Sequence, residues 1–210
     1  MAITRDTSLT ADGASASSRT RSYTCSGSNR LLLVVITKRT SDDMTGVTYN
    51  GVAMIQLIKR DHADSTEFLY IYGLLNPASG THDIVASASG ASVMYLGATS
   101  YNGVLQTDPL TNVTFSASNA LALTVTANDA MFVFAQNSVD VVGGSTGSTL
   151  INEFNGTGQL ESNPLVITSS GSFTMNYTGT SNDAIGVAFS PFVFTYNPSI
   201  ARRRLLLANM

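Results

Sequence analysis

Alternation of apolar and polar residues runs through most of this chain and predicts β-strands. The clearest examples are residues 66–73 (TEFLYIYG), 120–127 (ALALTVTA) and 172–179 (SFTMNYTG). A period of two is typical of a strand with one buried face, because successive side chains point to opposite sides. We therefore expect Leu121, Leu123 and Val125 to share one buried face.

Two further runs are apolar on both faces and predict strands at the centre of the fold. They are residues 30–39 (RLLLVVITKR) and 129–136 (DAMFVFAQ). Strands buried on both sides read as continuous hydrophobic runs. We expect burial at the apolar positions of these runs and of a third run near the C-terminal end, namely Leu31, Leu33, Val35, Phe132, Phe134, Val187 and Phe189.

Turn sequences separate these runs at short intervals. Asn50-Gly51, inside VTYNGVAMIQLI, is a strong signal for a β-hairpin. Short strands at this spacing are typical of sandwiches and barrels, and no window indicates a long helix. We predict an all-β, two-sheet antiparallel sandwich of about twelve strands over residues 1–198, followed by an extended C-terminal tail over 199–210. Residues 141–158, rich in Gly, Ser, Thr and Asn, are expected to form the longest loop.

Composition narrows the class of protein. Hydrophobic residues make up 43% of the 210 residues, which excludes an intrinsically disordered chain. No apolar run approaches the roughly 20 residues of a membrane-spanning helix, and the polar N-terminal stretch lacks the hydrophobic region of a secretion signal. The single cysteine, Cys25, lies in a strand-like stretch and is interpreted as a small core residue.

Charge is segregated along the chain. Residues 1–60 contribute +4, residues 61–201 contain no lysine or arginine and contribute −10, and the tail contributes +3, for a net charge of −3. Two interpretations stay open: folding mixes the segments in space, or basic ends meet acidic bodies of neighbouring copies. Nucleic-acid binding is not expected, because the N-terminal cations are scattered and lack an adjacent aromatic platform.

Candidate catalytic and metal sites are weak. Residues 143–147 (GGSTG) match G-x-S-x-G, but both histidines precede Ser145 and no helix follows, so we interpret the match as a flexible loop. Asp61, His62, Asp64 and Glu67 could bind a divalent cation, although their spacing fits no known loop and a solvated turn is the simpler interpretation. We expect no enzymatic activity and no cofactor.

Two polar features have structural explanations. His82 and Asp83 are expected to cap the start of a strand. The tyrosines alternate within predicted strands and are expected in the core or on a sheet face rather than in a sugar-binding platform, which the absence of tryptophan also disfavours. They are Tyr23, Tyr49, Tyr70, Tyr72, Tyr95, Tyr101, Tyr177 and Tyr196.

Four stretches in succession resemble a jelly-roll-like sandwich module of tailed-bacteriophage structural proteins and bacterial surface proteins. They are SGSNRLLLVVI, VTYNGVAM, YIYGLLNPASGTHDIVASAS and GATSYNGVLQTDPL, within residues 5–136, with a closing strand at AIGVAFSPF. Phage proteins of this kind often end in a short basic and leucine-rich tail, as this chain does. The resemblance implies a virion component, such as a capsid decoration, head-fibre or tail protein, assembled in the host cytoplasm. Its partners would be copies of itself, as a homo-oligomer, and other virion proteins, with no membrane contact; the alternative is a glycan- or receptor-binding module.

The tail residues are the candidate assembly contacts: Arg202, Arg203, Arg204, Leu205, Leu206 and Leu207. Asn197-Pro198 breaks the preceding strand-like run, so the tail is expected to leave the sandwich. Three exposed leucines would be an aggregation hazard, so they should be covered. They either fold back on their own domain or, as we favour, insert into a neighbouring copy while the arginines pair with its acidic body.

Overall fold

The computed structural model describes residues 2–39, 43–61, 67–137, 147–154, 157–178 and 182–193. Every regular element among them is a β-strand, and every strand pairing is antiparallel. The predicted all-β antiparallel sandwich is confirmed, with fourteen strands in this part of the chain where about twelve were expected.

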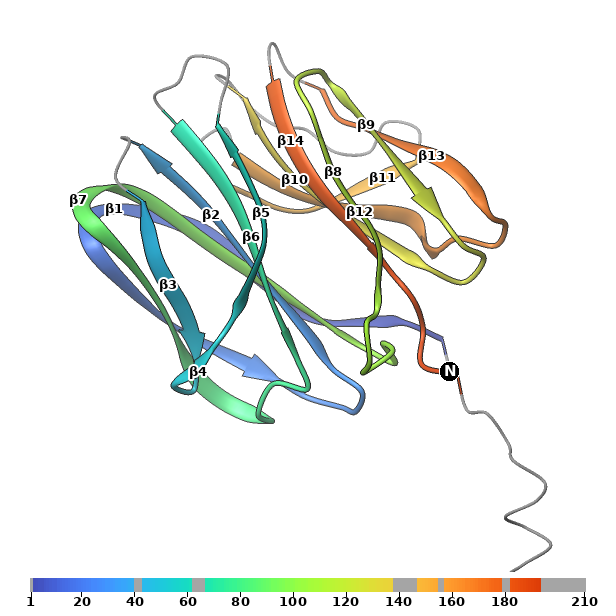
Figure 1. Cartoon of the computed structure of the whole chain (residues 1–210), viewed down its shortest axis with the longest axis horizontal. Coiled ribbons are helices and arrows are strands. Elements are labelled where there is room, and N and C mark those ends of the chain that lie inside the picture. The colour runs from blue at the N-terminus through green and yellow to red at the C-terminus, as the bar shows by residue number, and fades with distance from the viewer. Residues whose placement is uncertain are drawn as a thin grey trace, which may run out of the picture.

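Hydrogen bonds group the strands into three sheets, where two were expected, because β9 and β13 pair apart from the two large sheets (Figure 1). The first has the order β4–β3–β7–β2–β6–β5, with β1 also paired to β7; its strands are β1 (Thr4–Cys25), β2 (Leu31–Arg39), β3 (Met44–Tyr49), β4 (Val52–Ala53), β5 (Ile55–Asp61), β6 (Glu67–Leu75) and β7 (Gly80–Asn102). The second has the order β11–β12–β10–β14–β8; its strands are β8 (Leu110–Ser116), β10 (Ala130–Asn137), β11 (Ser148–Phe154), β12 (Thr157–Val166) and β14 (Asn182–Phe189). The third pairs β9 (Ala120–Val125) with β13 (Gly171–Asn176).

The long strands β1 and β7 curl the first sheet. They pair from Thr4↔Asn102 to Cys25↔Gly80, with irregularities in register along the way. The later part of β7 also pairs with β2, whereas its earlier part pairs with β3. The two parts of β7 therefore belong to different layers, which lie on the left and in the centre of Figure 1.

Strand β2 is buried on both faces, as its sequence predicted. Leu32, Val34 and Ile36 join a first core with residues of β3, β6 and β7. Leu31, Leu33 and Val35 join a second core, between the two large sheets, with residues of β10 and β14. All seven residues that we expected to be buried lie in this second core and are at most 2% exposed.

A third core lies beneath the pair β9–β13, which covers the other face of β10 and β14. Leu121, Leu123 and Val125 face it together, as their alternation predicted. Gly186 in β14 permits this close packing, because a Cβ atom there would lie 2.4 Å from Cδ2 of Leu121. Stacking these layers buries β10 on both faces as well.

Two local predictions have different outcomes. Asn50 and Gly51 both have positive φ and join Tyr49 to its partner Val52, so the predicted hairpin is confirmed. The long loop expected over 141–158 is wrong for residues 148–154, which form β11, and for 157–158, which begin β12, while 141–146 and 155–156 lie outside the described residues. Strand β11 is stabilised by apolar residues on both faces, since Leu150 packs on the third core and Ile151 on the second.

Candidate functional site

An apolar groove of about 520 Å³ lies beside the edge strands β5 and β8. In the described part of the chain, β5 ends the first sheet and β8 ends the second. The groove is lined by Leu31, Ala53, Ile55, Leu57, Gly73, Leu74, Leu75, Asp108, Pro109 and Leu110. Asp108 is the one charged residue of this lining, and its position is exposed. We call this feature the edge groove.

Large apolar side chains are exposed along both strands that border the edge groove. Ile55 of β5 is 70% exposed, and Phe115 and Val113 of β8 are 54% and 39% exposed. We call these three residues the apolar seam. Val113 and Phe115 are register partners of Val187 and Ile185, which are fully buried in the second core. Because paired residues share a face, the second core continues outward along β8 to solvent. Such an exposed strand edge can pair with another chain.

Arg60 of β5 contacts Phe115 of β8 at the end of the apolar seam away from the edge groove. Its guanidinium carbon lies 4.5 Å from the ring centroid of Phe115. Its Nε lies 3.6 Å from Oδ1 of Asp183, a fully buried side chain of β14. Arg60 therefore holds β5 against the second sheet, so the border of the groove is fixed by contacts within the chain.

Five other N-terminal cations also lie close to acids of their own chain. Arg5 lies 3.5 Å from Glu161, Arg39 2.5 Å from Glu67 and Lys59 2.7 Å from Asp43. Arg19 and Arg21 both contact Asp12. Folding thus mixes the N-terminal charges with acids in space, as the first of our two interpretations expects. Residues 1–201 have a net charge of −6, which is opposite in sign to the three arginines of the tail.

Burial affects the protonation of Glu161, one of these acids. Its side chain is 9% exposed and lies between the two large sheets, with Arg5 at 3.5 Å. Burial raises the pKa of Glu161 above its ordinary value of 4.5, and the nearby Arg5 opposes this only in part. The folded state therefore binds the proton of Glu161 more tightly than the unfolded state does.

We expect the free energy of unfolding of Glu161→Gln to increase relative to that of the parent chain as the pH rises above 4.5. With a raised folded-state pKa, the unfolding free energy falls as the pH rises through that range, and the amide removes this dependence. Chemical denaturation between pH 4 and 8 measures the difference.

Asp43→Asn is a control of opposite sign. Lys59 lowers the pKa of Asp43, so the stability that this carboxylate contributes is present at neutral pH and lost in acid. Parallel pH profiles for Glu161→Gln and the parent chain would contradict the assignment of Glu161.

The residues considered for metal binding are only partly described. Asp61 is exposed at the end of β5, and Glu67 contacts Arg39 at the start of β6, while His62 and Asp64 lie outside the described residues. Among the described residues, no group of three or more His, Cys, Asp or Glu side chains is arranged to hold a metal ion.

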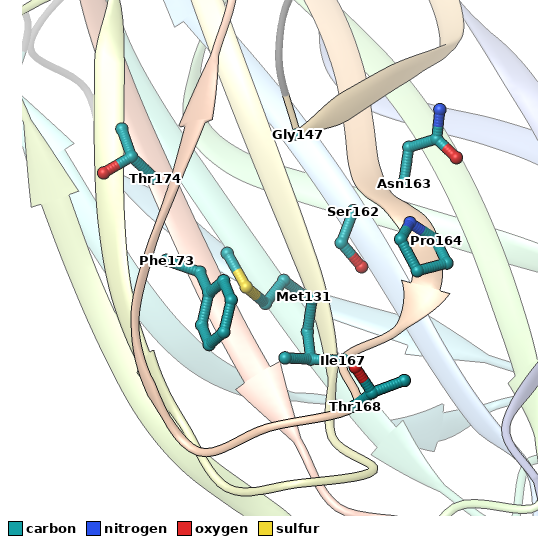
Figure 2. A pocket seen from close by; sticks show the side chains of 9 residues that line it. All are labelled: Met131, Gly147, Ser162, Asn163, Pro164, Ile167, Thr168, Phe173 and Thr174. Atoms are coloured by element: carbon teal, nitrogen blue, oxygen red, sulfur yellow. The ribbon is translucent and has the colours of Figure 1, made fainter.

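A second, smaller pocket of about 150 Å³ includes Gly147, the one described residue of the G-x-S-x-G match. Met131, Ile167 and Phe173 form its apolar side, as Figure 2 shows. The hydroxyl of Ser162 donates a hydrogen bond to the carbonyl of Leu165 at 2.8 Å and so serves the local backbone. The residues that line this pocket are all uncharged.

His82 and Asp83 lie near the start of β7, as predicted, beside an open polar hollow of about 420 Å³. Nε2 of His82 lies 3.1 Å from the carbonyl oxygen of Ser79, and its ring meets Tyr49 edge to face at 5.6 Å. These contacts support a structural role at the strand start.

The seven described tyrosines are all buried, as expected for core residues. Tyr196 lies outside the described residues, as do the candidate assembly residues Arg202–Arg204 and Leu205–Leu207. Cys25 is also buried, at 1% exposure, and burial raises the pKa of its thiol, in agreement with its interpretation as a core residue. No local sequence pattern indicated the edge groove, whose apolar lining is exposed beside two sheet edges.

Comparisons with known proteins identify no relative: no family model, curated protein or solved structure matches the chain. No helix long and apolar enough to cross a membrane occurs in the described ranges.

Proposed function

We propose that this chain is a non-enzymatic structural protein of a tailed phage or phage-like particle, which acts by binding copies of itself and docking on the particle. The observation that carries the self-association is the exposed apolar seam along two sheet edges. Exposed edges and apolar patches of this kind mark surfaces that contact other proteins. The placement in a virion comes from the resemblance of the strand and turn motifs described above and is part of the proposal.

The position of the aromatic residues favours assembly over the alternative, a glycan- or receptor-binding module. A sugar site would be expected to gather exposed aromatic rings in a concave pocket at the loop end of the sandwich. In the described ranges the tyrosines are buried, and Phe115, the exposed large aromatic residue, lies on strand β8. This arrangement suits a lateral contact between proteins.

Light scattering of the purified chain over a concentration series tests the proposal directly. We expect a defined oligomer whose population rises with concentration. A chain that stays monomeric to high concentration and binds an immobilised glycan would favour the alternative.

We further expect the assembly to weaken as salt is raised from about 0.05 to 0.5 M. Exposed charge pairs between a basic tail and an acidic body are screened beyond roughly 10 Å at 0.1 M. Light scattering in sodium chloride measures this, with the unfolding midpoint as a control for the fold itself. Assembly unchanged by salt would indicate that apolar and strand-edge contacts dominate, and would refute the contribution of the charge pairs.

A further inference from the structure

We propose that the edge groove is the receptor for the leucine segment Leu205–Leu207 of a neighbouring copy. This inference rests on the proposed self-association and deepens it, by naming both surfaces of the contact. The groove supplies an apolar lining beside two sheet edges, and the segment supplies three consecutive apolar side chains.

The shape of the groove suits an extended segment. It lies along an edge strand of each large sheet, where backbone groups can accept an added strand. In an extended segment Leu205 and Leu207 point to one side and Leu206 to the other. One side can thus fill the space lined by Ile55, Leu57 and Leu110, and the other can face the exposed apolar residues of the seam.

The described chain ends close to the groove. The backbone nitrogen of Ser190 donates a hydrogen bond to the carbonyl of Pro109, which lines the groove, at 2.8 Å. Pro191 then pairs with Val104, and Val193, the last described residue, is 62% exposed. The described chain thus ends at the same end of the molecule as the groove. In a dimer with two-fold symmetry, each copy would donate its leucine segment to the groove of the other.

Length and charge are compatible with the exchange. Eleven residues, 194–204, separate Val193 from Leu205, and they can span about 36 Å when extended. Arg202–Arg204 come immediately before the leucines and would lie at the mouth of the groove when these are bound. Asp108 is exposed in that lining, on a body with a net charge of −6.

Disulfide trapping in the full chain tests the proposal. Ala53 lines the groove at an exposed position, and Ala208 follows the leucines, so both can be changed to cysteine without removing a leucine. Ala53→Cys chains are mixed with Ala208→Cys chains under oxidised glutathione, and the 53–208 bond is sought by peptide mass spectrometry. The matched control is Ala122→Cys, at an exposed position of β9 in the outermost layer. The native Cys25 is buried.

We expect a covalent dimer joined through 53–208, formed at least about tenfold faster than 122–208, because binding raises the effective concentration of the two thiols. The assignment to a neighbour would be overturned by two results together. The double variant Ala53→Cys/Ala208→Cys would form the 53–208 disulfide only within one chain, and the mixture of single variants would form no disulfide between chains. An oligomer by light scattering with no 53–208 bond would refute the groove but leave the proposed self-association intact. A chain that is monomeric at every concentration would refute both.

Discussion

Replacement of Phe132 by alanine is expected to lower the free energy of unfolding by about 3–5 kcal/mol, because it removes a large side chain from a site that cannot collapse. Phe132 is fully buried in the second core, which it shares with inward residues of β2 and β14. At this chain length the loss corresponds to a fall in melting temperature of roughly 10 °C. Urea denaturation and calorimetry measure both quantities.

Phe115 is the matched control, since it is the same residue type in the same sheet but 54% exposed. Phe115→Ala loses its contact with Arg60 and is expected to cost less than about 1 kcal/mol. It should nevertheless weaken assembly, because it removes an exposed ring from the apolar seam. Equal losses of stability for the two variants would contradict the separation of core from contact surface that the fold indicates.

The same distinction explains which parts of the fold were predictable from sequence. A strand that is buried on both faces needs a continuous apolar run in its sequence, and such runs identified β2 and β10 as central strands. Asn50-Gly51 likewise specifies its turn through the positive φ angles that these residues adopt readily.

The sequence of strand β1 contains no such apolar run. Its 22 residues are rich in Ser, Thr and charged residues and are held mainly by backbone pairing along β7. Pairing over this length depends on the partner strand and hardly on the apolar pattern of β1 itself. Gly13 shows the dependence, since a Cβ atom there would lie 2.2 Å from Cε1 of Tyr95, a residue far away in sequence.

The edge groove was not predictable for a related reason. Its lining comes from β2, β4, β5 and β6 of the first sheet and from residues 108–110 at the start of β8, and these two parts meet only when the two large sheets pack. Exposure of Ile55 and Phe115 cannot be recognised locally, since each occurs in a stretch that resembles other half-buried strands. The tail, in contrast, was conspicuous in sequence, because its arginines and leucines depart from the composition around them.

Deletion of residues 201–210 is expected to abolish assembly while leaving the melting temperature of the remaining chain nearly unchanged. The three described cores are built from residues within 3–189, so we expect them to form without the tail. Burial of the three leucines in a neighbour would contribute roughly 1.5–3 kcal/mol each, and two reciprocal contacts would reinforce one another. Light scattering and calorimetry on the same samples separate the two effects.

Two full-length variants separate the contribution of the tail leucines to assembly from that of the tail arginines. Changing Leu205, Leu206 and Leu207 to serine keeps the charge and should abolish assembly at every salt concentration. Changing Arg202, Arg203 and Arg204 to glutamine keeps the apolar segment and should weaken assembly at low salt, with little further loss at high salt, since screening removes the same attraction. If the deletion instead lowers the melting temperature of the monomer by as much as Phe132→Ala does, the leucines pack on their own domain and the exchange between copies is wrong.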